Sequence, residues 1–454
     1  MSINSRCFWT YCYHRHPGGG GGGGVDDSNG GHTLYDDFSG SYIDSSKWHH
    51  NEFVRKVDPV QEKLVSKVAS DSENVFNSTF FQNPLTINAI KAGITVVETS
   101  VDTGTNVMAR IGGMFYNTQA AGGFTGEVLA AVGIFEEGSG LGASWFILEF
   151  LDDNGDTWNL IDSGTLISAG TLSYSTEYEA EIVWTAGTNQ FSFTLNSQSA
   201  TATGPGYARQ AVDGSKRLTT RTYFTTGTTG YISALFDNVF INGSGTAYDT
   251  FDTAPINRTN WSSDEVVREI SNGALQLDRQ GFDDRSTMGI SLVDNNTDYL
   301  GAEVTVEIGS SVSAGATGIA RLNGYYYNDT FGPGSHNGYE GNVFVQIRIR
   351  LDESDNLITQ AFVDRSDNAD ETLWTPLYSH DFTTKINFDE DYSLSIEFTG
   401  SELIFTCDGE QDSYNITTAT HEPYNEFRGL RSRVYLDSGE SGYIKVKFDN
   451  VYVD

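Results

Sequence analysis

The sequence predicts an all-β protein built from two tandem β-sandwich or barrel domains, and three observations support this. Glycine, tyrosine and phenylalanine are abundant (49, 23 and 27 residues), a composition typical of many short strands joined by turns. Apolar and polar residues alternate along many short segments, whereas helical periodicity is nearly absent; only residues 61–69 are ambiguous. Two blocks of sequence also occur twice, which indicates a duplication.

The duplicated blocks lie at the beginning and the end of each repeat. The opening block at residues 35–38, with Trp48 after it, returns at residues 248–251 with Trp261. The closing block at residues 230–241 (GYISALFDNVFI) returns 212 residues later as GYIKVKFDNVYV. A nearly constant offset predicts two homologous domains, at 33–242 and 246–454, joined by a linker of only a few residues.

Bulk properties exclude several functional classes. A net charge of −34 argues against nucleic-acid binding, which needs a surplus of lysine and arginine. No segment reaches the roughly 18 apolar residues of a membrane helix. Three cysteines cannot form a disulfide framework, and Cys407 is predicted to be a small core residue.

Residues 1–32 are predicted to be a disordered segment that contains a tether, because Gly18–Gly24 form an unbroken glycine run. The run resembles the spacer that follows the lipidated cysteine of many bacterial surface lipoproteins. However, no apolar lipobox precedes Cys7 or Cys12, and no signal peptide is visible. We expect an extracellular or cell-surface location, with a lipid-anchored tether as one route, and a monomer.

In the first domain, alternating runs predict strands within 94–97, 128–135, 145–151, 178–184 and 191–195. Residues 152–156 (DDNGD) predict a hairpin turn. The second domain repeats this order: residues 320–324 match 109–113, residues 343–351 match the region after Val128, residues 392–398 match 178–184, and residues 433–435 match 221–223.

The closing strand is predicted to contain a β-bulge in both repeats. Ile444, Val446 and Phe448 alternate with lysines, but the apolar residues after the Asp449-Asn450 pair have the opposite parity. Two roles are open for the carboxylate at this position. It can accept hydrogen bonds from N–H groups that the bulge leaves unpaired, or it can bind a structural Ca²⁺. The candidate calcium ligands are Asp237, Asp449, Asp36 and Asp249.

The Asp-x-Phe…Trp opening, a late Arg-x-Tyr and the closing Gly-Tyr-x-x-x-Phe-Asp-Asn-Val strand together resemble the concanavalin A-like lectin/glucanase superfamily. The match covers both repeats. It implies antiparallel jelly-roll sandwiches of the type found in LamG-like modules, laminarinase-type glycosidases, alginate lyases and carbohydrate-binding modules. It also implies a calcium ion near the chain ends, but it implies a fold more than an activity.

Catalytic motifs of that superfamily are missing. No strand carries the Glu-x-Asp-x-(x)-Glu string of retaining glucanases; residues 145–152 are the nearest match, with a single carboxylate in the strand. Gln346-Ile347-Arg348 lacks the histidine of the lyase Gln-x-His motif. We therefore assign no catalytic residue and favour a binding protein over an enzyme.

The second repeat carries a candidate sugar-binding face. Glycans are bound by flat aromatic rings and planar hydrogen-bonding groups, and arginine pairs bidentately with carboxylate or sulfate. Alternation places Val345, Ile347 and Ile349 in the core and the residues between them on the opposite face. The candidate binding residues are Arg321, Tyr325, Tyr327, Gln346, Arg348, Arg350, Arg431 and Arg433.

Two interpretations of these arginines are open: a groove for an anionic polysaccharide, or neutralisation of acidic residues on neighbouring strands. In the first repeat only Arg110, Trp145 and Glu149 suggest binding. The sequence predicts a non-catalytic carbohydrate-binding protein. A polysaccharide-degrading enzyme (glycoside hydrolase or lyase) and a protein-binding adhesin or structural module are the alternatives.

Overall fold

The computed structural model describes residues 31–454 except 71–73, 121–122, 213, 224–227, 284 and 333–334. The predicted tether, with Cys7 and Cys12, lies outside these residues. Within them the chain is almost entirely β-structure, apart from one turn of 3₁₀ helix at Pro84–Thr86. The predicted all-β class of antiparallel jelly-roll sandwiches is confirmed, and residues 61–69, ambiguous in the sequence, lie largely in a strand.

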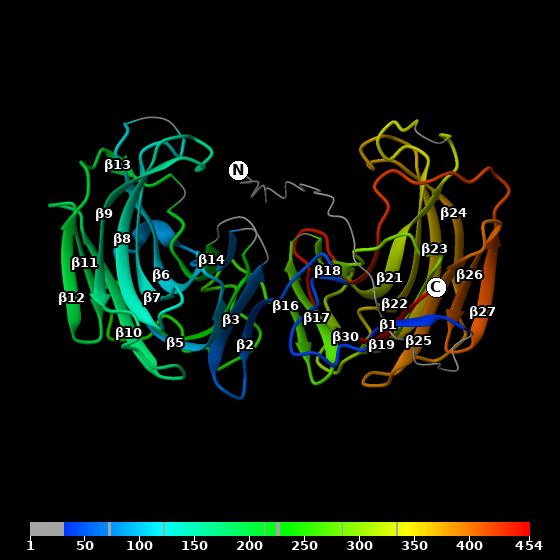
Figure 1. Cartoon of the computed structure of the whole chain (residues 1–454), viewed down its shortest axis with the longest axis horizontal. Helices are drawn as coiled ribbons and strands as arrows, with labels where there is room; N and C mark the ends of the chain where they lie inside the picture. The colour runs from blue at the N-terminus through cyan, green and yellow to red at the C-terminus, as the bar shows by residue number, and fades with distance from the viewer. Residues whose placement is uncertain are drawn as a thin grey trace.

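The first sandwich consists of two antiparallel sheets (Figure 1). One has the spatial order β12 (Gln198–Thr203), β11 (Gln190–Leu195), β10 (Glu177–Thr185), β5 (Ala89–Val101), β15 (Gly230–Ile241), β3 (Lys63–Ser70) and β2 (Phe53–Asp58). The other has the order β4 (Val75–Phe80), β14 (Arg217–Tyr223), β6 (Asn106–Asn117), β7 (Glu127–Glu136), β8 (Gly142–Phe150) and β9 (Trp158–Ile167), with β13 (Arg209–Gln210) also beside β6. The predicted turn at 152–156 joins β8 to β9.

The second sandwich repeats this arrangement. Its first sheet has the order β16 (Val266–Ser271), β17 (Ala274–Phe282), β29 (Ser441–Ile444) followed in line by β30 (Val446–Val453), β19 (Tyr299–Val306), β25 (Tyr392–Phe398), β26 (Glu402–Cys407) and β27 (Glu410–Asn415). The short strands β1 (Thr33–Asp36) and β20 (Ser311–Val312) pair with β30 and β29. Its second sheet has the order β18 (Ser286–Ser291), β28 (Arg428–Tyr435), β21 (Thr317–Asn328), β22 (Asn342–Leu351), β23 (Leu357–Ser366) and β24 (Trp374–Asp381).

The closing strands follow the predicted alternation. Ile444, Val446 and Phe448 are fully buried in the second core, and the register of β15 and of β30 against their neighbours shifts near the Asp-Asn pair. The bulge is therefore confirmed in both repeats. Cys407 is also fully buried in the second core, as predicted.

The opening blocks are exchanged between the two cores. Phe38 and Trp48, which open the first repeat, pack in the second core, and Trp48 forms a β-bridge with Leu292. Phe251 and Trp261 pack in the first core, where Trp261 forms a β-bridge with Phe81. Each core is thus completed by the opening block that the sequence assigns to the other repeat. The boundaries 33–242 and 246–454 stay a prediction about the repeats as sequence units.

The two sandwiches are joined by direct strand pairing. β2 pairs with β16 in an antiparallel register that sets Val54 opposite Val267, so the two main sheets form one continuous sheet at the centre of the molecule (Figure 1). Side chains reinforce this pairing in a reciprocal way: Arg55 Nε donates to the Asp264 carbonyl (2.8 Å) and Arg268 Nε to the Asn51 carbonyl (2.6 Å). A short, buried join of this kind fixes the two repeats against each other.

Candidate functional site

Most of the predicted binding residues lie on one face of the second sandwich. The strands β28, β21 and β22 lie side by side, and each turns one set of side chains into the core. The opposite set forms what we call the arginine face, which consists of Arg321, Tyr325, Gln346, Arg348, Arg350, Arg431 and Arg433. The sequence-based alternation on β22 is confirmed, since Val345, Ile347 and Ile349 are fully buried in the core.

Strand register sets the arginines directly beside one another. Arg321 on β21 is the cross-strand partner of both Arg431 on β28 and Arg348 on β22. In the next row, Arg433 and Arg350 flank the buried Ile319 in the same way. Side chains opposite each other in an antiparallel pair are close neighbours, and like charges there are destabilising. Five arginines in two adjacent rows are an unusual arrangement in a chain this acidic.

The arginines contact amides and aromatic rings instead of carboxylates. Arg321 Nη1 donates to Gln346 Oε1 (2.9 Å), and Arg348 Nη2 donates to Gln360 Oε1 (2.9 Å). No ion pair joins Arg321, Arg348, Arg350 or Arg433 to a carboxylate of the residues that the structure describes. Direct ion pairs therefore do not hold these four arginines, but the charges of Asp364 and Asp381 act on Arg348, so neutralisation by acidic residues on neighbouring strands stays open as an interpretation.

Acidic groups border the face at its β23–β24 edge. Gln360 donates from Nε2 to Asp381 Oδ1 (2.7 Å), so this carboxylate meets Arg348 only through an amide. Asp364 lies on the same face, and burial raises its pKa while the charge of Arg348 lowers it. These two carboxylates bound the face on one side and leave the central rows to the arginines.

Burial and mutual repulsion both disfavour the charge on this face. Arg321 is only 8% exposed, and its pKa is lowered well below the usual value by burial and then by Arg431, Arg433 and Arg348. Burial and then the charge of Arg350 lower the pKa of Arg348 to about 10, while the charge of Asp364 opposes them. These groups remain charged at neutral pH, and each would gain from an anion placed between them.

Several donors and acceptors of the face have no protein partner. The Nε atoms of Arg321, Arg350 and Arg433 are buried without a hydrogen-bond acceptor among the described residues. Asn323, 1% exposed on β21 beside Arg321, has neither an acceptor for its Nδ2 nor a donor for its Oδ1 within the described part of the chain. Buried polar groups are nearly always paired, so a cluster of exceptions is typical of a ligand site.

Aromatic rings border the arginine rows at one end. Tyr325 contacts Phe427 and Phe344 edge to face, with ring centroids 5.1 and 5.6 Å apart, and Phe344 contacts Trp374 (6.0 Å). Trp374 is 38% exposed, whereas Tyr325 is 5% exposed. Trp374 therefore offers the accessible ring, and Tyr325 supports its neighbours.

Tyr327 does not belong to the face. The sequence predicts that Tyr325 and Tyr327 share a side of the strand, but the register shifts between them at a β-bulge. Tyr327 is 1% exposed and stacks on Phe398 inside the second core (5.6 Å). This expectation is wrong because strict alternation fails wherever an extra residue enters the strand.

Other residues of the face were missed by the sequence analysis. Phe344 and Phe362 lie on it, and Arg348 stacks on Phe362 with 4.1 Å between its guanidinium carbon and the ring centroid. Phe344 shares the parity of Arg348, so the alternation already contained the signal. Gln360 and Asn323 could be found in the same way, by following every outward position instead of the charged ones alone.

The three residues of the first repeat that suggested binding in the sequence do not lie together. Trp145 points into the first core and stacks on Phe193 (4.7 Å). Glu149 accepts a hydrogen bond from the Thr118 hydroxyl (2.6 Å) near the end of β8. Arg110 alone lies at the centre of the outward face, where it stacks on Phe146.

The four predicted calcium ligands each have protein partners. Asp36 accepts from the Trp48 indole (2.7 Å) and Asp249 from the Trp261 indole (2.7 Å). Asp237 and Asp449 each accept from the next backbone N–H (2.6 and 2.7 Å) at the bulge, and Asp237 also pairs with Lys63 (3.2 Å). Among the described residues, no three histidine, cysteine or acidic side chains gather as a metal site would require. The contacts fit the hydrogen-bonding role, and calcium stays a prediction without support from this geometry.

Comparisons with known proteins find similarity only at the level of solved structures. No protein-family model and no curated protein matches the chain. Alginate lyase Aly36B is 15% identical over 41% of this chain and 82% of its own, with a TM-score of 0.26. The κ-carrageenase from Pseudoalteromonas carrageenovora is 12% identical over 40% and 81%, with a TM-score of 0.24. Domains LG4-5 of the mouse laminin α1 chain are 11% identical over 85% and 92%, with a TM-score of 0.21. At these values the similarities assign neither family nor function.

No helix in the described part of the chain has the length and apolarity needed to cross a membrane.

Proposed function

We propose that this protein is a non-catalytic carbohydrate-binding protein whose arginine face binds an anionic polysaccharide, such as a uronate or a sulfated glycan. The observation that carries the proposal is the set of five arginines in two adjacent cross-strand rows, whose neighbours are one another, glutamines and rings. Within a protein of net charge −34, this face is a local site of positive charge.

Guanidinium chemistry supports an anionic ligand. Arginine forks bind carboxylate and sulfate oxygens bidentately, and such charge-assisted bonds are about twice as strong as neutral ones. An anion between Arg321 and Arg348 would replace repulsion by attraction on both sides. It would also supply acceptors for the Nε groups of Arg321 and Arg350, which have none.

The surroundings of the arginines support a sugar as the carrier of that anion. Trp374 and the edge of Phe344 provide apolar ring surface for the C–H face of a pyranose. Asn323 and Gln346 place amides beside the guanidinium groups, although they are only 1% and 6% exposed and Gln346 Oε1 already accepts from Arg321. Rings, amides and guanidinium groups on one surface match a charged polysaccharide better than an isolated inorganic anion.

The same chemistry favours binding over cleavage. Amide side chains do not exchange protons near neutral pH, and the guanidinium groups stay charged there, so they suit recognition better than general acid–base catalysis. An extracellular or cell-surface location belongs to this proposal, because that is where a polysaccharide of this type is met. The arginine face of one molecule suffices, so a monomer is the proposed active form.

The proposal is tested by comparing two arginine substitutions on the same sheet. Arg348→Ala removes a fork from the centre of the face, and we expect the dissociation constant for a polyuronate or sulfated glycan to rise at least about tenfold, a loss of about 1.4 kcal/mol. Affinity electrophoresis against neutral and anionic polysaccharides measures this change.

Arg365→Ala is the matched control. Arg365 lies on β23 of the same sheet, but it is already held by Asp367 (3.0 Å) and Asp329 (3.4 Å). Its loss should leave the dissociation constant within about twofold. Equal effects of the two substitutions would mean that general charge, and not the arginine face, attracts the glycan.

A further inference from the structure

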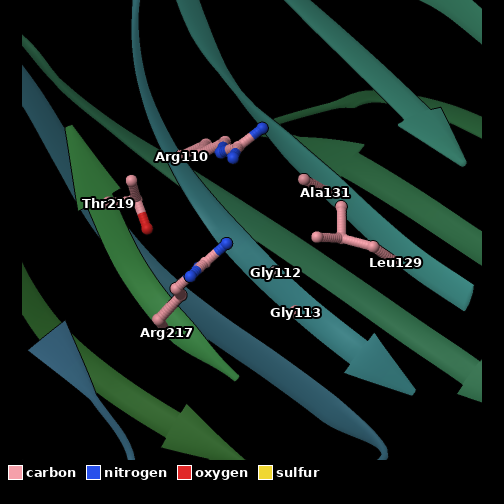
Figure 2. A pocket seen from close by; sticks show the side chains of 7 residues that line it. All are labelled: Arg110, Gly112, Gly113, Leu129, Ala131, Arg217 and Thr219. Atoms are coloured by element: carbon pink, nitrogen blue, oxygen red, sulfur yellow. The ribbon is translucent and has the colours of Figure 1, made fainter. Parts of the chain in front are cut away.

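The first sandwich carries a separate group of arginines on its own outward face. On β14, Arg217, Thr219 and Arg221 alternate with buried residues, and the register sets Thr219 opposite Arg110 and Arg217 opposite Gly112 of β6. Figure 2 shows Arg110, Arg217 and the Thr219 hydroxyl projecting from these neighbouring strands around a small hollow. The sequence analysis named Arg110 but not Arg217 as a candidate; in the second repeat Gly429 stands at the position of Arg217.

Arg110 is the least solvated charge in this group. It is 5% exposed, and no hydrogen bond or ion pair joins it to any residue that the structure describes. Among those residues, the Arg110 side chain stacks on the ring of Phe146, whose centroid lies 5.1 Å from the guanidinium carbon. A buried guanidinium without acceptors costs free energy unless something else pairs with it, so its presence needs an explanation.

Small residues create the space next to Arg110. A shallow surface hollow is lined by Arg110, Gly112, Gly113, Leu129, Ala131, Arg217 and Thr219. Gly133, opposite Arg110 on β7, is required for the arginine to lie there, because a Cβ at Gly133 would come within 2.6 Å of the Arg110 Cβ. The hollow is too shallow to enclose a ligand, so one charged group can meet the arginines at its mouth but a whole sugar ring cannot enter.

Charge accumulates around this hollow. Burial lowers the pKa of Arg110 well below its usual value, and the charges of Arg221 and Arg217 lower it further. Arg221 has a buried Nε without an acceptor and stacks on Phe76 (4.5 Å). Arg217 stacks on Phe80 (5.2 Å). The rings hold the guanidinium groups in position, and an anion between them would relieve their repulsion.

We propose that this hollow is a second anion-binding site, which takes one carboxylate or sulfate group through the forks of Arg110 and Arg217. The Thr219 hydroxyl beside them is 1% exposed and already shares a hydrogen bond with the Ser78 hydroxyl (3.1 Å). This second site rests on the proposed function only in the choice of glycan as the carrier of that group. With a site on each sandwich, and the sandwiches fixed by the β2–β16 pairing, the protein can hold two segments of one acidic polymer. Two linked sites bind more tightly than either alone when the polymer spans both.

The test uses the full chain with Arg348→Ala, so that the arginine face is weakened and the hollow is observed. Inorganic sulfate is titrated at constant ionic strength against chloride, and the rise in melting temperature gives its dissociation constant. We expect Arg217→Gln to raise that constant about tenfold, and Arg110→Lys, which keeps the charge but loses the fork, to raise it as well. Melting temperatures in chloride alone verify that each variant folds.

Arg209→Gln is the control, because Arg209 lies nearby on β13 with its Nε bonded to the Gln119 carbonyl (2.9 Å). It should leave the sulfate response unchanged. An unchanged response in Arg217→Gln and Arg110→Lys would overturn the proposal.

Two glycan titrations identify the source of the anion and separate the two proposals. The Arg348→Ala protein is titrated with an oligouronate and with a sulfated oligosaccharide. If either glycan binds and Arg217→Gln weakens that binding about tenfold, the result supports the anion site in the hollow. If Arg217→Gln leaves the binding unchanged, the result contradicts that site. If glycan binding by the wild type is insensitive to Arg348→Ala while the sulfate response still depends on Arg217, the arginine-face proposal fails and the hollow stands.

Discussion

Two buried arginines of the second domain show what separates a structural side chain from a binding one. Arg428 is 1% exposed, and its guanidinium donates to the Tyr325, Phe427 and Thr297 carbonyls and to Glu426. Arg321 is almost as buried, but it has one amide acceptor and an Nε without any. Arg428 is therefore a structural side chain, whereas the Nε of Arg321 without an acceptor supports the binding role that we propose for that residue.

This difference predicts a trade between stability and binding at Arg433. Burial lowers the pKa of Arg433, and the charges of Arg285 and Arg431 lower it further, so the residue is held in an unfavourable charged state. We expect Arg433→Gln to raise the free energy of unfolding without ligand by about 0.5–1 kcal/mol, as substitutions at binding sites often do. The same variant should bind an anionic glycan several-fold more weakly.

Urea unfolding and affinity electrophoresis of the same sample check the two halves of this prediction. A protein that loses stability on Arg433→Gln would show that the side chain is structural.

A buried carboxyl group predicts a specific pH dependence. Asp278 on β17 accepts from the Gln276 amide (2.6 Å) and the Val446 N–H (3.2 Å), and burial raises its pKa from 3.8 to about 7. The folded protein therefore keeps a proton that the unfolded chain releases, and the free energy of unfolding falls as the pH rises from about 4 to about 7. In Asp278→Asn this part of the pH dependence should be missing.

Urea unfolding of both proteins at pH 4 and pH 8 measures the difference between the two slopes. Parallel pH profiles would mean that Asp278 is ionised in the folded state at both pH values.

At the scale of elements, the opening block of each repeat packs on the core of the other repeat and helps to hold it together. The Asp36–Trp48 and Asp249–Trp261 hydrogen bonds are equivalent, and both tryptophans are at most 1% exposed. Glu52 and Glu265 lie at equivalent positions and accept from the equivalent N–H groups of Ile43 and Ile256. The two blocks are thus built alike and exchanged.

The exchange predicts which core each tryptophan stabilises. Trp48→Ala should destabilise the second sandwich and Trp261→Ala the first, each by about 3–5 kcal/mol, because a large buried side chain is removed. Amide hydrogen exchange, followed strand by strand, measures these effects. Trp48→Ala should accelerate exchange in β18 and β30 more than in β6 and β7. Faster exchange in β6 and β7 would mean that each block serves its own repeat.

The strand content and the core parity could be predicted from the sequence because they follow from local alternation. The bulge at the Asp-Asn pair was predictable for the same reason, since the apolar residues change parity there. The exchange of the opening blocks could not be predicted. The offset between the two repeats in the sequence is the same whether an opening block packs on its own core or on the other core. The core position of Tyr327 was also hidden, since nothing in Tyr325-Tyr326-Tyr327 marks a bulge.

At the scale of the molecule, the join between the sandwiches lies on a pseudo-twofold axis. Val54 and Val267, opposite each other in the β2–β16 pair, are equivalent positions of the two repeats. Lys56 and Glu269 are equivalent too, and they form an ion pair across the join (2.8 Å). In a symmetric dimer of identical chains the same residue would meet itself; after duplication, the two copies can carry opposite charges.

The same asymmetry extends to the outward faces. The second sandwich carries five arginines in two rows, and the first carries three, of which Arg110 and Arg217 line a hollow beside small residues. Arg110 and Arg221 match Arg321 and Arg433 of the second repeat, but Arg217 stands at the position of Gly429, and β7 has no arginine where β22 has Arg348 and Arg350. The arginine face remains the principal proposed site because it combines more charge with exposed ring surface.

One measurement tests the central claim most directly. The full chain is incubated with neutral, uronate and sulfated polysaccharides, with calcium and with EDTA, and both the bound protein and newly formed chain ends are recorded. We predict retention on an anionic glycan, loss of most retention with Arg348→Ala, and no new chain ends. New chain ends would make the protein a polysaccharide-degrading enzyme, and no retention on any glycan would contradict the claim and favour a protein partner.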